Sequence, residues 1–208
     1  MNQSATNITP RYLERSEHSV SRKEIDAEAL KVLYRLAQNN YLAYLVGGGV
    51  RDLLLGRKPK DFDVGTDART ETVRRLFRNS RMIGRRFKIN HVYFHGGKII
   101  EVATFRDLVE EPITEAQSRV TTKQDNTYGT PETDALRRDL TINGLFYDIS
   151  TYRVIDYVGG IDDLRAGIIR IIRDPDQRIK EDPVRMIRAI RHAARTGFTI
   201  EPKTYSAI

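Results

Sequence analysis

One stretch, "YLAYLVGGGVRDLLLGRKPKDFDVGT" at residues 41–66, constrains the fold of this chain more than any other. A short apolar run meets three glycines, a helical turn or two follows, and an aspartate–phenylalanine–aspartate strand comes next. Alternate side chains of a strand point to opposite faces, so Asp61 and Asp63 share one face while Phe62 and Val64 enter the core. The stretch therefore predicts a strand–turn–helix–strand unit that carries two carboxylates side by side.

Two carboxylates at this spacing repel each other and resist double ionisation unless a cation lies between them. Hard oxygen ligands of this kind suit Mg²⁺. A third carboxylate, Glu101, interrupts the otherwise apolar strand "KIIEVATFR". If the two strands are neighbours, Asp61, Asp63 and Glu101 converge on two metal ions about 4 Å apart, as phosphoryl transfer requires. An isolated aspartate–x–aspartate sequence is also common at exposed turns. The neighbouring residues therefore have to show whether this one binds a metal.

The glycine turn supplies that context. At Gly47 and Gly48 the backbone N–H groups can approach a triphosphate, and the helix that follows adds positive dipole character. Arg51 lies in this helix and can reach a phosphate or the 3′ end of a primer. The alternative is a surface pair between Arg51 and Asp52.

Composition narrows the classes of partner, site and compartment that we expect for this chain. The chain has 208 residues, no cysteine and a formal net charge of +7. The charge favours a polyanion such as RNA, although a solvated basic surface would give the same balance. The absence of cysteine excludes a disulfide framework and a cysteine-based zinc site. No apolar run approaches the roughly 18 residues of a membrane span and the N-terminus resembles no secretory signal, so we expect a cytoplasmic protein with no transmembrane segment.

Hydrophobic periodicity and turn residues outline the remaining elements. We expect helices over 23–40, 68–80, 161–167 and 180–196, a hairpin over 89–106, two strands within 140–160, a long loop over 107–135 and the start of another helix after 197. In the helix over 180–196, Asp182 is the expected N-cap and Pro183 the first residue. Its expected core stripe is Ile187, Ile190 and Ala194.

The same helix carries residues that suit base recognition. In its first turn the carboxylate of Asp182 can accept from an exocyclic amine and the guanidinium of Arg185 can donate to a ring nitrogen. Together they can read a Watson–Crick edge without a nucleic-acid template. Arg188 would add a triphosphate or base contact, with a solvated helix face as the alternative.

Four ordered motifs resemble one family. "YLVGGGVRDLLLGRKPKDFDV", "RRDLTINGL", "DYVGGIDDL" and "EDPVRMIRAIR" are similar to the motifs of the class II nucleotidyltransferases, which comprise bacterial poly(A) polymerases and tRNA CCA-adding enzymes. The stretch "MIGRRFKINHVYF" is closer to the poly(A) polymerases. Within it, Arg85, Arg86 and Lys88 form a basic cluster that could meet RNA, or simply a solvated strand start.

The resemblance implies an α+β fold: a polymerase-β-like head with a small mixed five-stranded sheet, followed by a helical neck, with body and tail absent. We expect a mobile N-terminal arm over 1–24, the head over 25–173 and the start of the neck over 174–208. The resemblance also implies that Asp61 and Asp63 bind two Mg²⁺ ions, with Mn²⁺ as a substitute, and that Glu101 supports them. Arg138 would contact the triphosphate and Asp139 would serve the active site near the ribose, where the residues alone suggest no more than a salt bridge.

The expected function is that of a polynucleotide adenylyltransferase: template-independent addition of AMP from ATP to RNA 3′ ends, with release of pyrophosphate. The resemblance also implies a role in mRNA processing and an association with the RNA-degradation machinery. CCA addition to tRNA is the nearest alternative. A non-catalytic RNA-binding module is a second, disfavoured by the intact carboxylates, and a small-molecule nucleotidyltransferase would not need the helix over 180–196.

Overall fold

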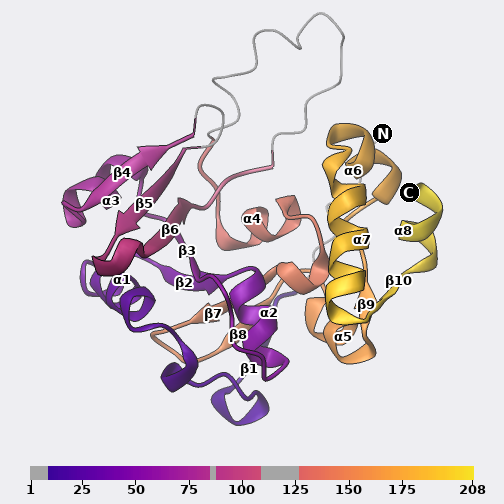
Figure 1. The fold of residues 1–208 in the computed structure, drawn as a ribbon, viewed down its shortest axis with the longest axis horizontal. Coiled ribbons are helices and arrows are strands. Elements are labelled where there is room, and N and C mark those ends of the chain that lie inside the picture. Colours follow the sequence, from indigo (N-terminus) through magenta and orange to yellow (C-terminus); the bar gives the residue numbers. More distant parts are fainter. Residues whose placement is uncertain (1–8, 85–87, 109–126) are drawn as a thin grey trace, which may run out of the picture.

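The computed structural model describes residues 9–84, 88–108 and 127–208. Its centre is a mixed sheet of eight strands in the order β1-β8-β7-β2-β3-β6-β5-β4, and β3 and β6 are parallel (Figure 1). The strands are β1 Arg11–Leu13, β2 Ala43–Val46, β3 Asp63–Thr66, β4 Ser80–Ile83, β5 Ile89–Tyr93, β6 Ile99–Thr104, β7 Leu145–Asp148 and β8 Val154–Asp156. A separate parallel pair joins β9 Ile168–Ile169 to β10 Thr199–Ile200. The α+β class is confirmed, but the expectation of five strands is wrong.

Two strands come from segments that were assigned differently. β1 lies in the expected mobile arm, where it pairs with β8 through Tyr12 opposite Ile155. Leu13 and Val20 are buried, so over residues 9–24 the chain is packed onto the sheet and is not an arm. Two apolar side chains in a polar segment were enough to anchor it. Residues 1–8 lie outside the described residues. β4 begins at Ser80, the last residue of the helix expected over 68–80.

The α-helices lie on both sides of the sheet and at one end of it. They are α1 Ala27–Gln38, α2 Gly48–Leu54, α3 Thr70–Leu76, α4 Pro131–Arg137, α5 Gly160–Ala166, α6 Pro175–Glu181, α7 Val184–Thr196 and α8 Pro202–Ala207. α6, α7 and α8 gather beside the sheet, with α2 and α5 between (Figure 1). Among the described residues no helix is long and apolar enough to cross a membrane.

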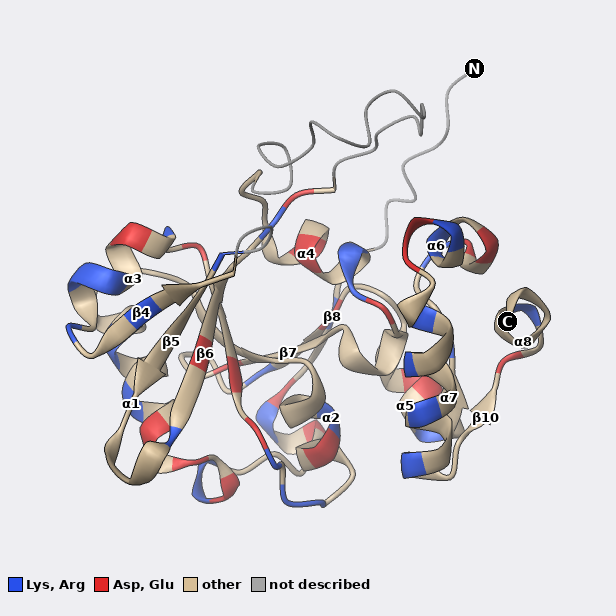
Figure 2. Cartoon of the chain, turned by 45° about the horizontal axis from the view of Figure 1, so that its top comes forward, with Lys and Arg blue, Asp and Glu red and all other residues tan. Residues whose placement is uncertain are grey.

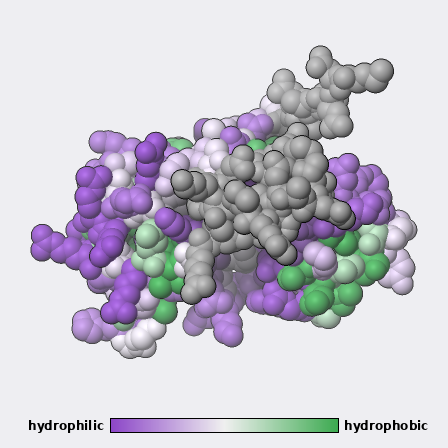
Figure 3. Space-filling view, turned by 90° about the horizontal axis from the view of Figure 1, so that it is seen from above, coloured by the Kyte–Doolittle hydropathy of each residue, from purple (hydrophilic) through white to green (hydrophobic). Residues whose placement is uncertain are grey.

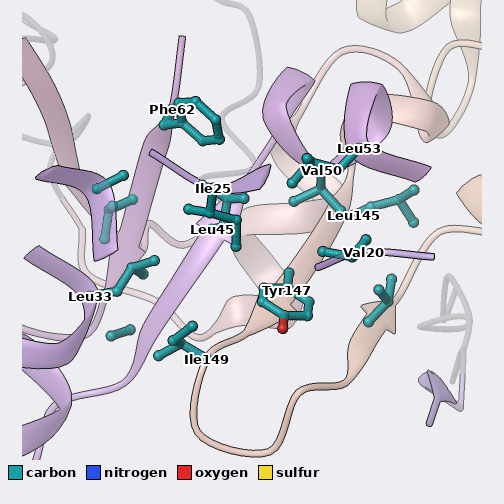
Figure 4. Close-up of a cluster of buried hydrophobic side chains, with 14 of the residues drawn as sticks. Val20, Ile25, Leu33, Leu45, Val50, Leu53, Phe62, Leu145, Tyr147 and Ile149 are labelled. Atoms are coloured by element: carbon teal, nitrogen blue, oxygen red, sulfur yellow. The ribbon is translucent and has the colours of Figure 1, made fainter. Parts of the chain in front are cut away.

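α1 follows its sequence pattern closely. The carboxylate of Asp26 accepts hydrogen bonds from the backbone N–H groups of Glu28 and Ala29, which caps the first turn. Its apolar stripe packs on the main core beside Leu45 of β2, part of which is drawn in Figure 4. The opposite face of the sheet holds a smaller cluster rich in aromatic residues, closed by Ala135 of α4: Tyr44, Val46, Phe105, Phe146, Ile155 and Tyr157.

α4 corrects the long loop expected over 107–135. Thr130 caps the helix by accepting from the N–H of Thr133, and Pro131 occupies its first position. Residues 109–126 of the expected loop lie outside the described residues. α6 was also missed, although Asp174 and Pro175 form the same kind of cap and first turn.

α7 begins at Val184, and the carboxylate of Asp182 accepts from the N–H of that residue. The expected core stripe is wrong: Ile187 and Ile190 are 67% and 50% exposed. The buried side of α7 instead carries small and polar residues, because it packs against a polar network described below. The apolar side faces outward, and Figure 3 shows hydrophobic surface over this end of the molecule.

A single glycine lets the aromatic cluster pack directly on β3. A Cβ atom on Gly65 would lie 2.6 Å from Cε1 of Phe105 and 3.0 Å from Cγ1 of Val46. We predict that Gly65→Ala lowers the free energy of unfolding by about 1–3 kcal/mol, because an added methyl overpacks this layer. Urea denaturation measures it. The double variant with Phe105→Leu should recover part of the loss; an unchanged midpoint in Gly65→Ala would contradict the packing described.

Candidate active site

The strand register places two of the expected carboxylates side by side. Asp63 on β3 is directly opposite Glu101 on the parallel strand β6, so both side chains leave the same face of the sheet. Phe62 and Val64 are buried, as strand alternation predicts. Asp61 is exposed and precedes β3. The neighbouring strands that the third carboxylate required are therefore present.

The environment of Asp63 disfavours its negative charge. Burial first, then the carboxylates of Glu101 and Asp61, raise the pKa of Asp63 to about 6, against the opposing charge of Arg138. This crowding fits a divalent cation held by Asp61 and Asp63. Within the described ranges, however, no three histidine or acidic side chains are grouped closely enough to hold a metal. The structure thus offers a pair of candidate ligands with Glu101 beside it, and no preassembled three-carboxylate cage.

The glycine turn and Arg138 lie together next to this pair. Gly47 adopts φ +70° and ψ −138°, a conformation open to glycine alone. A Cβ on Gly47 would lie 3.2 Å from Nη1 of Arg138. The guanidinium of Arg138 stands over the ring of Phe146 and donates to Asp134 from Nε (3.1 Å) and Nη2 (2.9 Å). It is therefore held in place before any ligand arrives, beside a turn whose first N–H, that of Gly47, donates to the carbonyl of Leu145 at 3.3 Å.

Arg51 lies against the glycine turn, since a Cβ on Gly48 would be 3.4 Å from its Nη2, and most of its donors have partners in the interior. It is 1% exposed, and Nε and Nη2 both donate to Oδ1 of Asp52 at 2.9 and 2.7 Å. Its Nη1 donates to Oδ1 of Asn143 at 2.6 Å and lies 3.2 Å from Nδ1 of His192. Arg195 of α7 pairs with the other oxygen of Asp52 at 3.0 Å. Contact of Arg51 with a phosphate or primer stays a prediction: its four contacts use four of its five N–H donors, and Nη2 is the nitrogen nearest the turn.

The network of Arg51 extends to the second motif. Burial lowers the pKa of His192 to about 4, with Arg51 as the next cause, so the imidazole is neutral and can accept from the guanidinium. Nδ2 of Asn143 donates to Asp139 at 3.4 Å. Burial raises the pKa of Asp139, but the ion pair with Arg188 at 2.5 Å outweighs it and the net shift is downward.

The residues expected to read the base lie at the start of α7, next to the backbone of Arg138. Nη1 of Arg185 donates to the carbonyl of Arg138 at 3.3 Å, and its buried Nε has no hydrogen-bond partner among the described residues. Asp182 ends α6 and leads into α7. Arg178, which the sequence did not single out, holds the backbone before the second motif in place. It is buried and donates to the carbonyls of Arg137 and Arg138 at 2.6 and 2.9 Å.

Of the expected RNA-binding cluster, Arg85 and Arg86 lie outside the described residues. Lys88 is exposed and lines a small cavity of about 60 Å³ beside β6. The other residues of its wall are Thr70, Glu71, Thr104, Arg106 and Tyr128. Figure 2 shows a second basic surface, the row of arginines along α7.

Sequence reasoning missed several residues that position the site: Asp134, Asn143, Arg178 and His192. Asp134 had a readable signal, because it precedes Arg138 by four residues on one helix. Arg178 follows the Asp174–Pro175 cap that predicts α6. Asn143 and His192 could not be linked to Arg51 from the sequence, since Arg51 lies 92 and 141 residues away from them in the chain.

The comparisons with known proteins agree with this geometry. The sequence profile described as "Poly A polymerase head domain" matches residues 43–170. Poly(A) polymerase I of Escherichia coli O6:H1 is 53% identical over 202 residues, covering 93% of this chain and 43% of the relative. A CCA-adding enzyme of Bacillus pumilus is 38% identical over 180 residues, covering 86% and 43%.

Among solved structures, the Bacillus stearothermophilus CCA-adding enzyme in complex with CTP matches with a TM-score of 0.74 and 36% identity, covering 87% of this chain and 42% of that one. The chain therefore spans less than half the length of the relatives it matches.

Asp63 gives a pH-dependent prediction. A carboxyl whose pKa is raised on folding opposes folding once it ionises, so the penalty is absent below its ordinary pKa of 3.8 and complete above about 6. In EDTA near pH 7, Asp63→Asn should therefore raise the free energy of unfolding by up to about 3 kcal/mol relative to the unsubstituted chain, and by much less near pH 4. Urea denaturation at the two pH values measures the difference.

Mg²⁺ provides the control for this effect. The cation should stabilise the unsubstituted chain more than Asp63→Asn, because binding to the folded state adds stability by mass action. Equal stabilisation of both proteins, or a gain that is the same at both pH values, would contradict the assignment.

Arg51 gives a prediction for stability. Arg51→Ala leaves Asp52 buried without its main partner and should lower the free energy of unfolding by about 3–5 kcal/mol. Arg195→Ala removes the half-exposed partner of the same carboxylate and should cost no more than about 1 kcal/mol. Denaturant titration of the two variants checks the contrast; similar losses would show that the interior position of Arg51 is wrong.

Proposed function

Since this chain belongs to the poly(A) polymerase head-domain family, we propose that it is the catalytic head of an enzyme that adds AMP from ATP to RNA 3′ ends without a template. The observation that carries the proposal is the placement of Asp63 and Glu101 next to the Gly47 turn and Arg138. Carboxylates for a cation and fixed donors for a triphosphate thus lie within one site. The greater identity to poly(A) polymerase I than to the CCA-adding enzymes supports ATP as the nucleotide.

The chain's own residues account for most of the binding. In this proposal the guanidinium of Arg138 and the N–H of Gly48 bind the triphosphate, the positive-φ turn at Gly47 lets it approach, and Asp134 fixes the orientation of the guanidinium. Asp61 and Asp63 would hold the Mg²⁺ ions, which Mn²⁺ could replace. When bound, these ions lower the pKa of the attacking hydroxyl and stabilise charge on the leaving pyrophosphate.

The reaction is an in-line displacement. The 3′-hydroxyl oxygen of RNA forms a bond to the α-phosphorus of ATP, and the bond from that phosphorus to the bridging oxygen of the β-phosphate breaks. The hydroxyl proton passes to solvent and pyrophosphate leaves. Glu101, opposite Asp63, adds negative charge that favours cation binding at this point of the sheet.

In this proposal Asp182 and Arg185 select the base of the incoming nucleotide. Arg185 contacts the backbone of Arg138, so the group that reads the base and the group that binds the triphosphate are mechanically linked. Arg188 is paired with Asp139 at 2.5 Å, and we propose that this pair lies near the ribose.

CCA addition to tRNA is the second candidate, supported by the similarity to the Bacillus stearothermophilus structure. The two functions share the catalytic groups and differ in nucleotide and RNA. A comparison of ATP alone with CTP alone, on unstructured RNA and on tRNA lacking its CCA end, separates them.

We predict that the chain extends unstructured RNA with ATP, and that Asp63→Ala lowers this rate by about 10³-fold or more, because several kcal/mol of charge stabilisation are lost. Gel analysis of a 5′-labelled RNA with Mg²⁺ measures extension. Asp162→Ala, at an exposed aspartate of α5, is the control and should retain activity. Efficient CTP incorporation into tRNA but no ATP incorporation into unstructured RNA would reject the first candidate, and an active Asp63→Ala would reject both.

A further inference from the structure

A row of side chains runs from the candidate catalytic carboxylates to the open edge of the sheet. Glu101 on β6 is opposite His91 on β5, and His91 is opposite Arg81 on the edge strand β4. With Asp63 they form one line across four strands, because residues in register project from the same face. Along this line the charge changes from acidic at the reaction site to basic at the edge.

The outer part of the row is a connected cluster. Nε2 of His91 lies 3.3 Å from a carboxylate oxygen of Glu101. Tyr93 is two residues further along β5 on the same face, and its ring is 6.3 Å from that of His91 in an edge-to-face arrangement. The guanidinium carbon of Arg81 stands 5.9 Å from the centre of the Tyr93 ring. Within the described part of the chain, Arg81 has no carboxylate partner.

This face of the outer strands is exposed at its margins, while His91, with 20% of its side chain exposed, and Tyr93 are half-buried on it. On it, Ile99 and Ile83 are 43% and 40% exposed, and Arg81 is exposed. The opposite face is closed: Asn90 is fully buried and donates to the carbonyl of Thr70 at the start of α3. In Figure 1, β4 and β5 form one end of the sheet, away from the C-terminal helices.

We propose that Arg81, His91 and Tyr93 bind the nucleotides just upstream of the RNA 3′ end, an inference that rests on the proposed function. The phosphates of RNA are repelled by Asp63 and Glu101 and attracted by Arg81, so the charge sequence of the row orients the strand with its terminal hydroxyl at the carboxylates. Tyr93 offers a ring for base stacking, and an aromatic ring next to a guanidinium is a surface that suits single-stranded RNA.

The dimensions of the row agree with this occupant. Three steps between neighbouring strands cover about 14 Å. At the ~3.4 Å rise of a stacked strand, this distance holds about four nucleotides. A short segment of RNA can therefore reach from the reaction site to the sheet edge.

The test is binding of a short 5′-labelled oligoadenylate by fluorescence anisotropy over a range of salt concentrations. Tyr93→Ala should weaken binding by about tenfold through loss of stacking, with the salt dependence unchanged. Arg81→Ala should weaken binding and reduce the slope of log K against log salt by about 0.7, the value for one phosphate contact on a single strand. ATP binding should be unchanged in both variants, because neither residue contacts the glycine turn.

Two matched variants control for side effects. Tyr93→Phe keeps the ring and should bind as the unsubstituted chain does. Arg74→Ala removes an exposed arginine of α3, on the other side of the sheet, and should change neither affinity nor salt slope.

The outcomes separate this inference from the proposed function. If the chain extends RNA but Arg81→Ala and Tyr93→Ala bind oligoadenylate unchanged, the inference is wrong and the proposed function stands. If no nucleotide is transferred to RNA, the proposed function fails, and the binding comparison still decides whether this face holds RNA. An equal loss in Arg74→Ala would also overturn the inference, since general charge would then explain binding.

Discussion

The arrangement of the site depends on one buried guanidinium. Arg51 projects from α2, directly after the glycine turn, and its donors meet Asp52 on the same helix, Asn143 in the second motif and His192 on α7. A buried cation of this kind is stable only when its hydrogen bonds are complete, so the three segments have to be in place together. The contact fixes the glycine turn relative to α7, the helix whose first turn is proposed to read the base. The buried contacts of Arg51 therefore give it a positioning role, and the proposed function assigns contact with the triphosphate to Arg138.

A second constraint is the crowding of negative charge where β3 and β6 run parallel. Asp63 and Glu101 are neighbours by strand register, and their repulsion is a cost that the fold retains. Arg138 offsets part of it, but its guanidinium is shared with Asp134. A cation supplied with the nucleotide would relieve the remainder, so the empty site and the loaded site should differ in stability. In this account the charge that opposes folding is the same charge that the proposed reaction uses.

Much of the site could be predicted because it depends on local geometry. Strand alternation placed Asp61 and Asp63 outward around buried Phe62, and the glycine turn was visible in the sequence. The strand of Glu101 was recognised as a possible neighbour, and the register confirms it. Arg51 could not be placed, because its burial depends on Asn143 and His192, 92 and 141 residues away in the chain.

Dependence on distant parts of the chain also explains the two wrong predictions near its ends. In α7 the apolar stripe of Ile187 and Ile190 was expected to face the core, but the buried side of the helix follows the polar network instead. In the N-terminal segment, Leu13 and Val20 lie in a polar context that hides their role in closing the sheet. Periodicity reports which residues are apolar, and it does not report which face the rest of the chain will cover.

The most direct test of the account is a crystal structure of the chain with Mg²⁺ and an ATP analogue that cannot be cleaved at the α-phosphate. The account predicts a cation between Asp61 and Asp63, phosphates against Gly47, Gly48 and Arg138, and Arg51 still in the interior. A nucleotide bound with its phosphates away from the glycine turn, or with no cation at the two aspartates, would contradict it.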